Sequence, residues 1–149
     1  MFGNGGPQRT EITRNDPSIP KNWYLYFSKH RKRVMKYQIN PAARCAVIGA
    51  GSWATAIVKI LLENEKRVGW YIREPEIRES IAANGTNARY LQDVHLDASR
   101  LAVSGDVNEV IANADIIVLA VPSAYIKTTL EPLTVSLEDK FIVSAIKGI

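Results

Sequence analysis

"VIGAGSWATAIVKILL", residues 47–62, joins a short apolar run to a pair of glycines and continues at once into a helical pattern. The apolar run, "CAVI" at 45–48, has the character of a strand buried on both faces in a parallel sheet. After the glycines, apolar residues recur with the spacing of one helix face: Ala54, Ile57, Val58, Leu61 and Leu62. The stretch therefore predicts a buried strand, a glycine turn and an amphipathic helix in direct succession.

The alternation of strand and helix continues from this stretch along the rest of the chain. Strands are predicted at 67–72, 100–105, 115–122 and 140–146, with helices between them at 75–84, 106–114 and 123–130. Parallel strands joined this closely need crossover helices, and right-handed crossovers place those helices on both faces of one sheet. We therefore predict an α/β fold with a doubly wound, mainly parallel sheet.

Residues at the predicted helix ends have the chemistry of start and stop signals. Pro75 suits a first helical turn, and Asn84 with Gly85 ends that helix. Asp106 is predicted to cap the next helix, with Glu109 three residues later as in a capping box. Ser123 is predicted to cap the helix that follows the strand at 115–122.

The positive charge of the chain is confined to its beginning. The formal net charge is +4, but residues 1–43 contain eight Lys and Arg against two Asp and Glu, whereas residues 44–149 contain eleven against thirteen. We therefore expect no nucleic-acid partner for the domain after residue 43. The single cysteine, Cys45, lies in the apolar run and is expected to be a core residue of a reduced, cytoplasmic protein. No apolar stretch approaches the roughly 20 residues of a membrane helix, so no membrane span is predicted.

Residues 1–43 are predicted to form a basic and partly aromatic extension with little order. Aromatic and basic residues cluster at 22–37. This segment is interpreted either as a solvated arm whose aromatic side chains pack on a neighbouring surface, or as an element that binds nucleic acid or a membrane surface. A third interpretation places the natural start of translation at Met35.

The glycine pair is predicted to bind the pyrophosphate of a dinucleotide. Residues 49–54, "GAGSWA", fit the pattern G-x-G-x-x-G/A directly after a strand and directly before a helix. Gly49 permits the tight turn, Gly51 lets the phosphates approach the backbone, and Ala54 lets helix and strand pack closely. The N–H groups at the helix N-terminus would then bind the phosphate oxygens. The alternative is a purely structural turn.

The end of the second strand bears on the choice between NAD and NADP. An NAD site usually presents Asp or Glu there to the ribose hydroxyls, and this chain has Arg73 followed by Glu74. Either Arg73 stacks on the adenine or pairs with a 2′-phosphate, which favours NADP or the use of both cofactors, or Glu74 faces the ribose and Arg73 points to solvent. His95 is expected to be a surface residue, and no spacing of His, Cys, Asp and Glu suggests a metal site.

Five segments together resemble the N-terminal half of bacterial NAD(P)-dependent glycerol-3-phosphate dehydrogenase: "VIGAGSWATAI", "WYIREPE", "GTNARYL", "VLAVPS" and "SAIKGI". The resemblance covers about residues 44–149 and implies a Rossmann-like cofactor-binding domain. It also implies an oxidoreductase that interconverts sn-glycerol 3-phosphate and dihydroxyacetone phosphate by hydride transfer with NAD or NADP, in the synthesis of glycerophospholipid precursors.

The same resemblance implies a set of cofactor-binding residues: Gly49, Gly51, Ser52, Trp53, Arg73, Pro122 and Lys147. Ser52 and Trp53 would contact the cofactor at the glycine turn, although Trp53 has core packing as its alternative. Pro122 and Ser123 would border the nicotinamide, and Tyr90 is a further candidate. Lys147 would contact both cofactor and substrate, since an ammonium at the carboxyl edge of the sheet can hold a phosphate and polarise a carbonyl. A surface lysine is the alternative.

Family enzymes of this kind continue into further sheet and a helical domain that carries the lysine used for proton transfer. We therefore expect this chain to be a fragment, truncated after the fifth strand, that binds cofactor but is inactive alone. A homodimer is a further expectation. Two other interpretations remain: a non-catalytic nucleotide-binding or sensing module, and the cofactor half of another Rossmann dehydrogenase. The segment from Asn87 to Leu91 and the pair Lys147-Gly148 favour the first interpretation over the last.

Overall fold

Five parallel strands form one sheet in the computed structural model, which describes residue 40 and residues 42–146. The strands are β1 (Cys45–Ile48), β2 (Val68–Tyr71), β3 (Leu101–Ser104), β4 (Ile116–Leu119) and β5 (Phe141–Ser144), in the spatial order β3-β2-β1-β4-β5. The predicted doubly wound α/β fold is confirmed. The predicted extension lies almost entirely outside the described residues, and so does Lys147.

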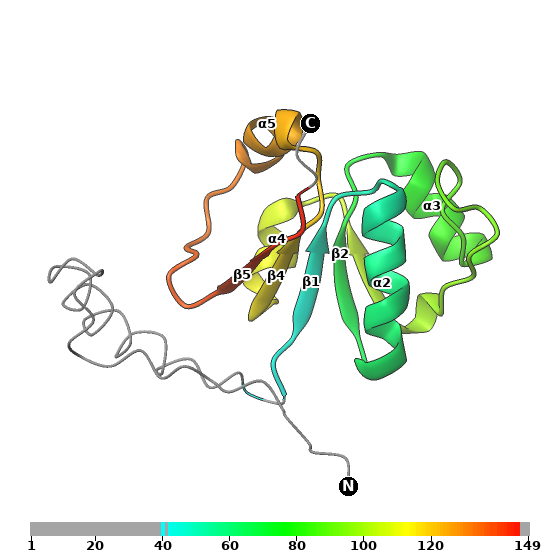
Figure 1. The fold of residues 1–149 in the computed structure, drawn as a ribbon, viewed down its shortest axis with the longest axis horizontal. Coiled ribbons are helices and arrows are strands. Elements are labelled where there is room, and N and C mark those ends of the chain that lie inside the picture. Colours follow the sequence, from blue (N-terminus) through cyan, green and yellow to red (C-terminus); the bar gives the residue numbers. More distant parts are fainter. Residues whose placement is uncertain (1–39, 41, 147–149) are drawn as a thin grey trace, which may run out of the picture. The chain divides into compact units, whose positions relative to one another are not determined.

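Helices connect the strands and cover both faces of the sheet. They are α2 (Ser52–Asn64), α3 (Pro75–Asn84), α4 (Val107–Ala112) and α5 (Ile126–Leu130), with short 3₁₀ turns η1 (Ala98–Arg100) and η2 (Ser123–Tyr125). Figure 1 shows α2 and α3 on one side of the sheet and α4 on the other. Within the described ranges, none of these helices combines the length and apolar character needed to cross a membrane.

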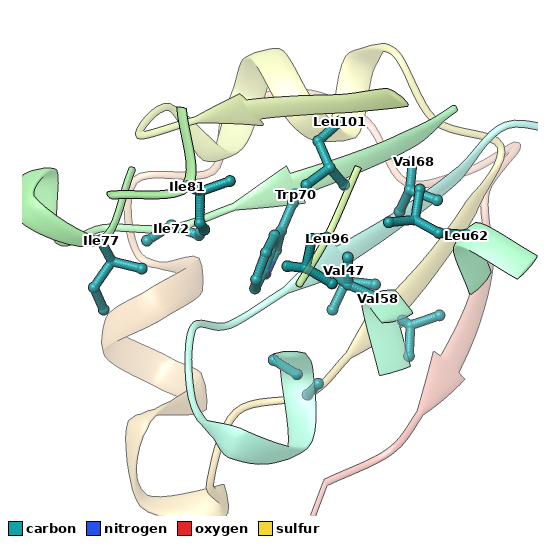
Figure 2. Close-up of a cluster of buried hydrophobic side chains, with 13 residues drawn as sticks. Val47, Val58, Leu62, Val68, Trp70, Ile72, Ile77, Ile81, Leu96 and Leu101 are labelled. Carbon is teal, nitrogen blue, oxygen red and sulfur yellow. The ribbon is translucent and has the colours of Figure 1, made fainter. Parts of the chain in front are cut away.

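Successive residues of the central strand point into two separate hydrophobic clusters, as the pleat of a strand requires. Val47 belongs to the cluster under α2 and α3, whereas Ala46 and Ile48 belong to the cluster under α4. Figure 2 shows the first of these clusters, with the Trp70 indole between the side chains of α3 and those of α2. Cys45 is buried as predicted, and burial raises the pKa of its thiol, which favours the unreactive neutral form.

The predicted caps of α3 and α4 are present, but the capping box is not. Gly85 adopts the left-handed conformation (φ 67°) and closes α3 with a hydrogen bond to the Ile81 carbonyl. Asp106 accepts a hydrogen bond from the Asn108 N–H at 2.8 Å and so caps α4. Glu109 does not reach back to the Asp106 N–H, because the Ser104 hydroxyl stands between them: it accepts from Asp106 N and donates to the Glu109 carboxylate.

The prediction that Ser123 caps a helix is wrong. The chain leaves β4 at Leu119, and residues 123–125 form a 3₁₀ turn in which the Tyr125 N–H donates to the Pro122 carbonyl at 2.9 Å. The helix α5 begins only after this turn, and no side chain caps it. The main-chain carbonyl of Pro122 thus accepts a hydrogen bond from an N–H of this turn, the role that was predicted for the Ser123 hydroxyl.

Candidate functional site

Gly49 makes the turn after β1 possible because no other residue fits its place. Its φ of +127° lies in the region that side chains rarely adopt, and a Cβ there would lie 2.6 Å from the Ala120 carbonyl oxygen. The Gly49 N–H donates to the Tyr71 carbonyl at 3.2 Å. The first glycine is therefore fixed between the ends of β2 and β4.

Gly51 faces open space, in contrast to Gly49. It is the N-cap of α2, with an ordinary extended backbone, and a Cβ added to it would meet nothing within 4 Å. The first turn of α2 contains no acidic residue that would repel an anion. Ala54, the third position of the glycine pattern, is fully buried between helix and sheet. The hollow beside Gly51 and the adjoining helix N-terminus together fit the phosphates of a nucleotide.

The glycine turn opens onto a pocket of about 330 Å³. The pocket lies at the carboxyl ends of β1, β2 and β4, where the strand order reverses direction between β1 and β4. Doubly wound sheets bind their ligands at this kind of position. Its lining residues come from the glycine turn, the end of β2 and the segment after it, α3 and the loop that follows it, the segment after β4, η2 and α5. They are Gly49, Ala50, Gly51, Tyr71, Arg73, Glu74, Ile77, Arg89, Tyr90, Val121, Pro122, Tyr125 and Thr129.

A buried tryptophan side chain forms a hydrogen bond with the main chain of the glycine turn. The indole N–H of Trp70 donates to the Gly49 carbonyl at 2.7 Å, and the Trp70 side chain is fully buried. A buried carbonyl without such a donor is costly, so this bond favours one orientation of the peptide after Gly49. The sequence predicted Trp70 only as part of a strand.

Two ion pairs lie at the β2 side of the pocket. Arg73 and Glu74 are paired at 3.3 Å, and the side chain of Glu74 is 27% exposed against 66% for Arg73. Arg89 pairs with Glu76. Both members of the first pair and Arg89 line the pocket. Acidic and basic groups therefore both line this side of the pocket.

The predicted cofactor residues fall into three groups. Gly49, Gly51, Arg73 and Pro122 line the pocket, and so does Tyr90. The described pocket lining does not include Ser52, which is exposed at the first position of α2, or Trp53. Lys147 lies outside the described residues.

Trp53 lies next to the glycine turn but belongs to neither the pocket lining nor the core. Its side chain is 55% exposed, so the alternative of core packing is wrong. Its indole N–H donates to the Ala145 carbonyl at 3.0 Å and ties the start of α2 to the residue after β5. His95 is exposed, as expected. Across residues 40 and 42–146, no three His, Cys, Asp or Glu side chains gather in a way that could hold a metal ion.

Several pocket residues had no role in the sequence-based prediction. Tyr125 and Thr129 come from η2 and α5, and their place depends on the unexpected 3₁₀ turn. Arg89 precedes Tyr90 in a loop without periodicity, and the family resemblance implied a role only for Tyr90. The signal that could have found them is their position just after the carboxyl end of a strand or beside a known site residue.

Comparison with known proteins supports a cofactor domain. The family model described as "NAD-dependent glycerol-3-phosphate dehydrogenase N-terminus" matches residues 44–149. Glycerol-3-phosphate dehydrogenase [NAD(P)+] of Pseudomonas paraeruginosa is 38% identical over 104 residues, which is 70% of this chain and 30% of that protein. The Nocardia farcinica protein of the same name is 37% identical over 112 residues, 71% of this chain and 33% of that protein.

Solved structures agree with this relationship. Glycerol-3-phosphate dehydrogenase from Coxiella burnetii superposes with a TM-score of 0.61 at 26% identity, covering 74% of this chain and 34% of that one. The enzyme from Saccharomyces cerevisiae gives a TM-score of 0.60 at 26% identity, covering 71% and 34%. This chain thus spans about a third of the length of the proteins it matches.

Proposed function

The chain belongs to the family of NAD-dependent glycerol-3-phosphate dehydrogenases, and from this premise we propose that it holds the cofactor of such an enzyme. The reaction is the interconversion of sn-glycerol 3-phosphate and dihydroxyacetone phosphate. Bound NAD or NADP would supply or accept the hydride of the secondary alcohol carbon, and the alcohol proton would be transferred separately. In this proposal, residues 44–149 are the cofactor-binding domain of the enzyme, and residues 1–43 lie outside that domain.

The observation that carries the proposal is the difference between the two glycines of the turn. Gly49 has its missing Cβ directed at protein backbone, and so it is required by the fold. Gly51 has its missing Cβ directed at open space beside a helix N-terminus and a pocket, so the fold does not require it. A glycine without a structural reason at this position supports a ligand that approaches the backbone closely.

The proposal assigns roles to the glycine turn and to several residues around it. The N–H groups at the start of α2 bind the pyrophosphate. Arg73 and Glu74 face the adenosine ribose, and Pro122 borders the nicotinamide. Ser52 and Trp53 contact the cofactor at the glycine turn.

Lys147 holds the substrate phosphate or carbonyl in this proposal, as the resemblance implies. The residue that transfers the substrate proton is not assigned to this chain, so we expect cofactor binding without turnover from residues 1–149 alone. Such a protein would act in the cytoplasm, and we propose a homodimer as its assembly.

Calorimetric titration of the chain with NADH and with NADPH tests the proposal. Binding of either dinucleotide is expected, and a folded chain that binds neither would contradict the proposed function. The variants Arg73→Ala and Glu74→Gln then separate the two interpretations of the β2 end. If Arg73 pairs with a 2′-phosphate, its loss weakens NADPH much more than NADH. If Glu74 holds the ribose hydroxyls, its loss weakens NADH more.

A further inference from the structure

A single buried asparagine joins the glycine turn to the loop that carries Arg89 and Tyr90. Asn87 is fully buried, although the residues that follow it, 88–93, are exposed. Its side-chain Nδ2 donates to the Ala50 carbonyl and to the Thr55 hydroxyl, each at 2.9 Å. Its Oδ1 accepts from the main-chain N–H groups of Arg89 at 3.0 Å and Tyr90 at 3.2 Å. Both donors and both lone pairs of the amide are therefore used.

The bonds from Nδ2 orient two successive peptide groups of the turn. The Ala50 carbonyl and the Gly51 N–H belong to one planar trans peptide, so fixing the carbonyl toward Asn87 directs the Gly51 N–H the opposite way. The Thr55 hydroxyl accepts from Asn87 and donates to the Gly51 carbonyl at 3.0 Å. The Gly51 carbonyl also accepts from the Thr55 main-chain N–H at 2.9 Å, and by the same geometry the two Thr55 donors together fix the direction of the Ser52 N–H. These two N–H groups are at the start of α2, where the phosphates are proposed to bind.

We propose that Asn87 is a positioning residue of the dinucleotide site, which aims the N–H groups of Gly51 and Ser52 and places Arg89 and Tyr90 at the pocket. The inference rests on the proposed function, because it assigns Asn87 a role in binding the dinucleotide at this turn. Without its amide, the Ala50 carbonyl loses its donor, the Thr55 hydroxyl loses one of its partners, and the loop loses its attachment to the turn. The dinucleotide should then bind more weakly even where the chain remains folded.

The chain contains a matched control for this role. Asn108 also uses its side-chain amide to hold a loop: Nδ2 donates to the Pro132 carbonyl at 2.9 Å, and Oδ1 accepts from the N–H groups of Thr134 at 2.7 Å and Val135 at 3.2 Å. It lies in α4, and neither it nor its partners line the pocket. Asn108→Ala therefore removes a comparable set of hydrogen bonds without touching the glycine turn.

The test compares NADH affinity and melting temperature for four variants of the chain, with calorimetry performed well below the lowest melting temperature. Asn87→Ala is expected to weaken NADH binding about tenfold or more, the loss of roughly one well-placed hydrogen bond to the cofactor. Asn108→Ala is expected to lower the melting temperature and leave the affinity unchanged. Thr55→Val, which lacks the hydroxyl, should weaken binding, and Thr55→Ser, which keeps it, should restore it.

Each outcome decides the inference. Affinity of Asn87→Ala within about twofold of the parent chain, or equal losses for Asn87→Ala and Asn108→Ala, would overturn it, since the role would then be general stability. If Asn87→Ala does not fold, the pair of Thr55 variants decides, because equal affinity of the two would likewise overturn it. A parent chain that is folded but binds no dinucleotide would refute the proposed function itself.

Discussion

At the scale of single residues, substitutions at Gly49 and Gly51 are expected to affect stability differently, although the two glycines are only two positions apart. Gly49→Ala places a Cβ 2.6 Å from the Ala120 carbonyl in a backbone conformation that alanine avoids. We expect it to reduce the free energy of unfolding by about 2 kcal/mol or more, measured by denaturant titration. Gly51→Ala, whose Cβ meets nothing, serves as the control, and equal losses of stability in the two variants would contradict this account.

The prediction for ligand binding is the reverse of the prediction for stability. Gly51→Val should leave the circular dichroism spectrum unchanged, because its side chain enters open space. The same side chain would occupy the place of the pyrophosphate, so NADH affinity should fall below detection by calorimetry. If the affinity were retained, the glycine turn would be a structural feature without a role in binding.

Asp115 should make a small contribution to stability that depends on pH. The Arg44 guanidinium and main-chain N–H donate to its carboxylate and hold its pKa below the ordinary value of 3.8. A lowered pKa means that this contribution is complete above the unfolded value and is lost as the pH falls through the folded one. Asp115→Asn should therefore melt slightly lower than the parent at pH 7, since the pair is exposed and screened.

The pH dependence distinguishes this ion pair from a simple loss of hydrogen bonds. The difference in melting temperature between parent and variant should shrink once the pH falls below 3.8 and disappear when the native carboxyl is protonated. A difference that stayed constant from pH 7 to pH 2.5 would show that charge is not involved.

The limits of sequence-based prediction are clearest at this scale. The glycine predictions followed from a pattern with a physical reason at each position, and the structure has a tight turn at Gly49 and open space at Gly51. The contributions of Trp70 and Asn87 did not follow, because their hydrogen bonds reach partners 21 and 37 residues away. Periodicity reports which face a residue occupies, and it carries no information on such distant partners.

At the scale of elements, the strands and the first three helices were predicted within a few residues. Their apolar periods, Pro75 and Gly85 are local signals, and the structure uses them locally. The segment between α3 and η1 has no period and was left without a predicted structure, yet it supplies Arg89 and Tyr90 to the pocket. The prediction that Ser123 caps a helix is wrong because the Pro122 carbonyl, and not a side chain, accepts from the Tyr125 N–H.

Capping of α4 offers a test at the scale of one helix. Asp106→Ala removes the acceptor for the Asn108 N–H and should cost about 1 kcal/mol of unfolding free energy in a denaturant titration. Glu109→Ala leaves that acceptor in place, and the Ser104 hydroxyl can still accept from Asp106, so its effect should be smaller. A larger loss for Glu109→Ala than for Asp106→Ala would restore the capping-box interpretation.

At the scale of the whole molecule, β5 is the feature that sets behaviour in solution. It is an edge strand of the sheet formed by the described residues, and Phe141, Ile142 and Val143 are each between 37% and 42% exposed. Exposed apolar edge strands promote association, and inward or outward charges on them prevent it. Ile142→Lys should reduce the concentration-dependent association of the chain in sedimentation velocity without changing its circular dichroism. A parent chain that sediments as a monomer at high concentration would contradict this expectation.

The order of the strands also has a consequence for how the chain is made. β1 is the central strand, and it pairs with β2 on one side and with β4 on the other. About 50 residues separate the ends of β2 and β4, which a ribosome adds in roughly 2–10 s at about 5–20 residues per second. During that interval one edge of β1 has no partner strand to pair with. For several seconds, the unpaired edge of β1 in the nascent chain is therefore open to pairing with other strands unless another molecule covers it.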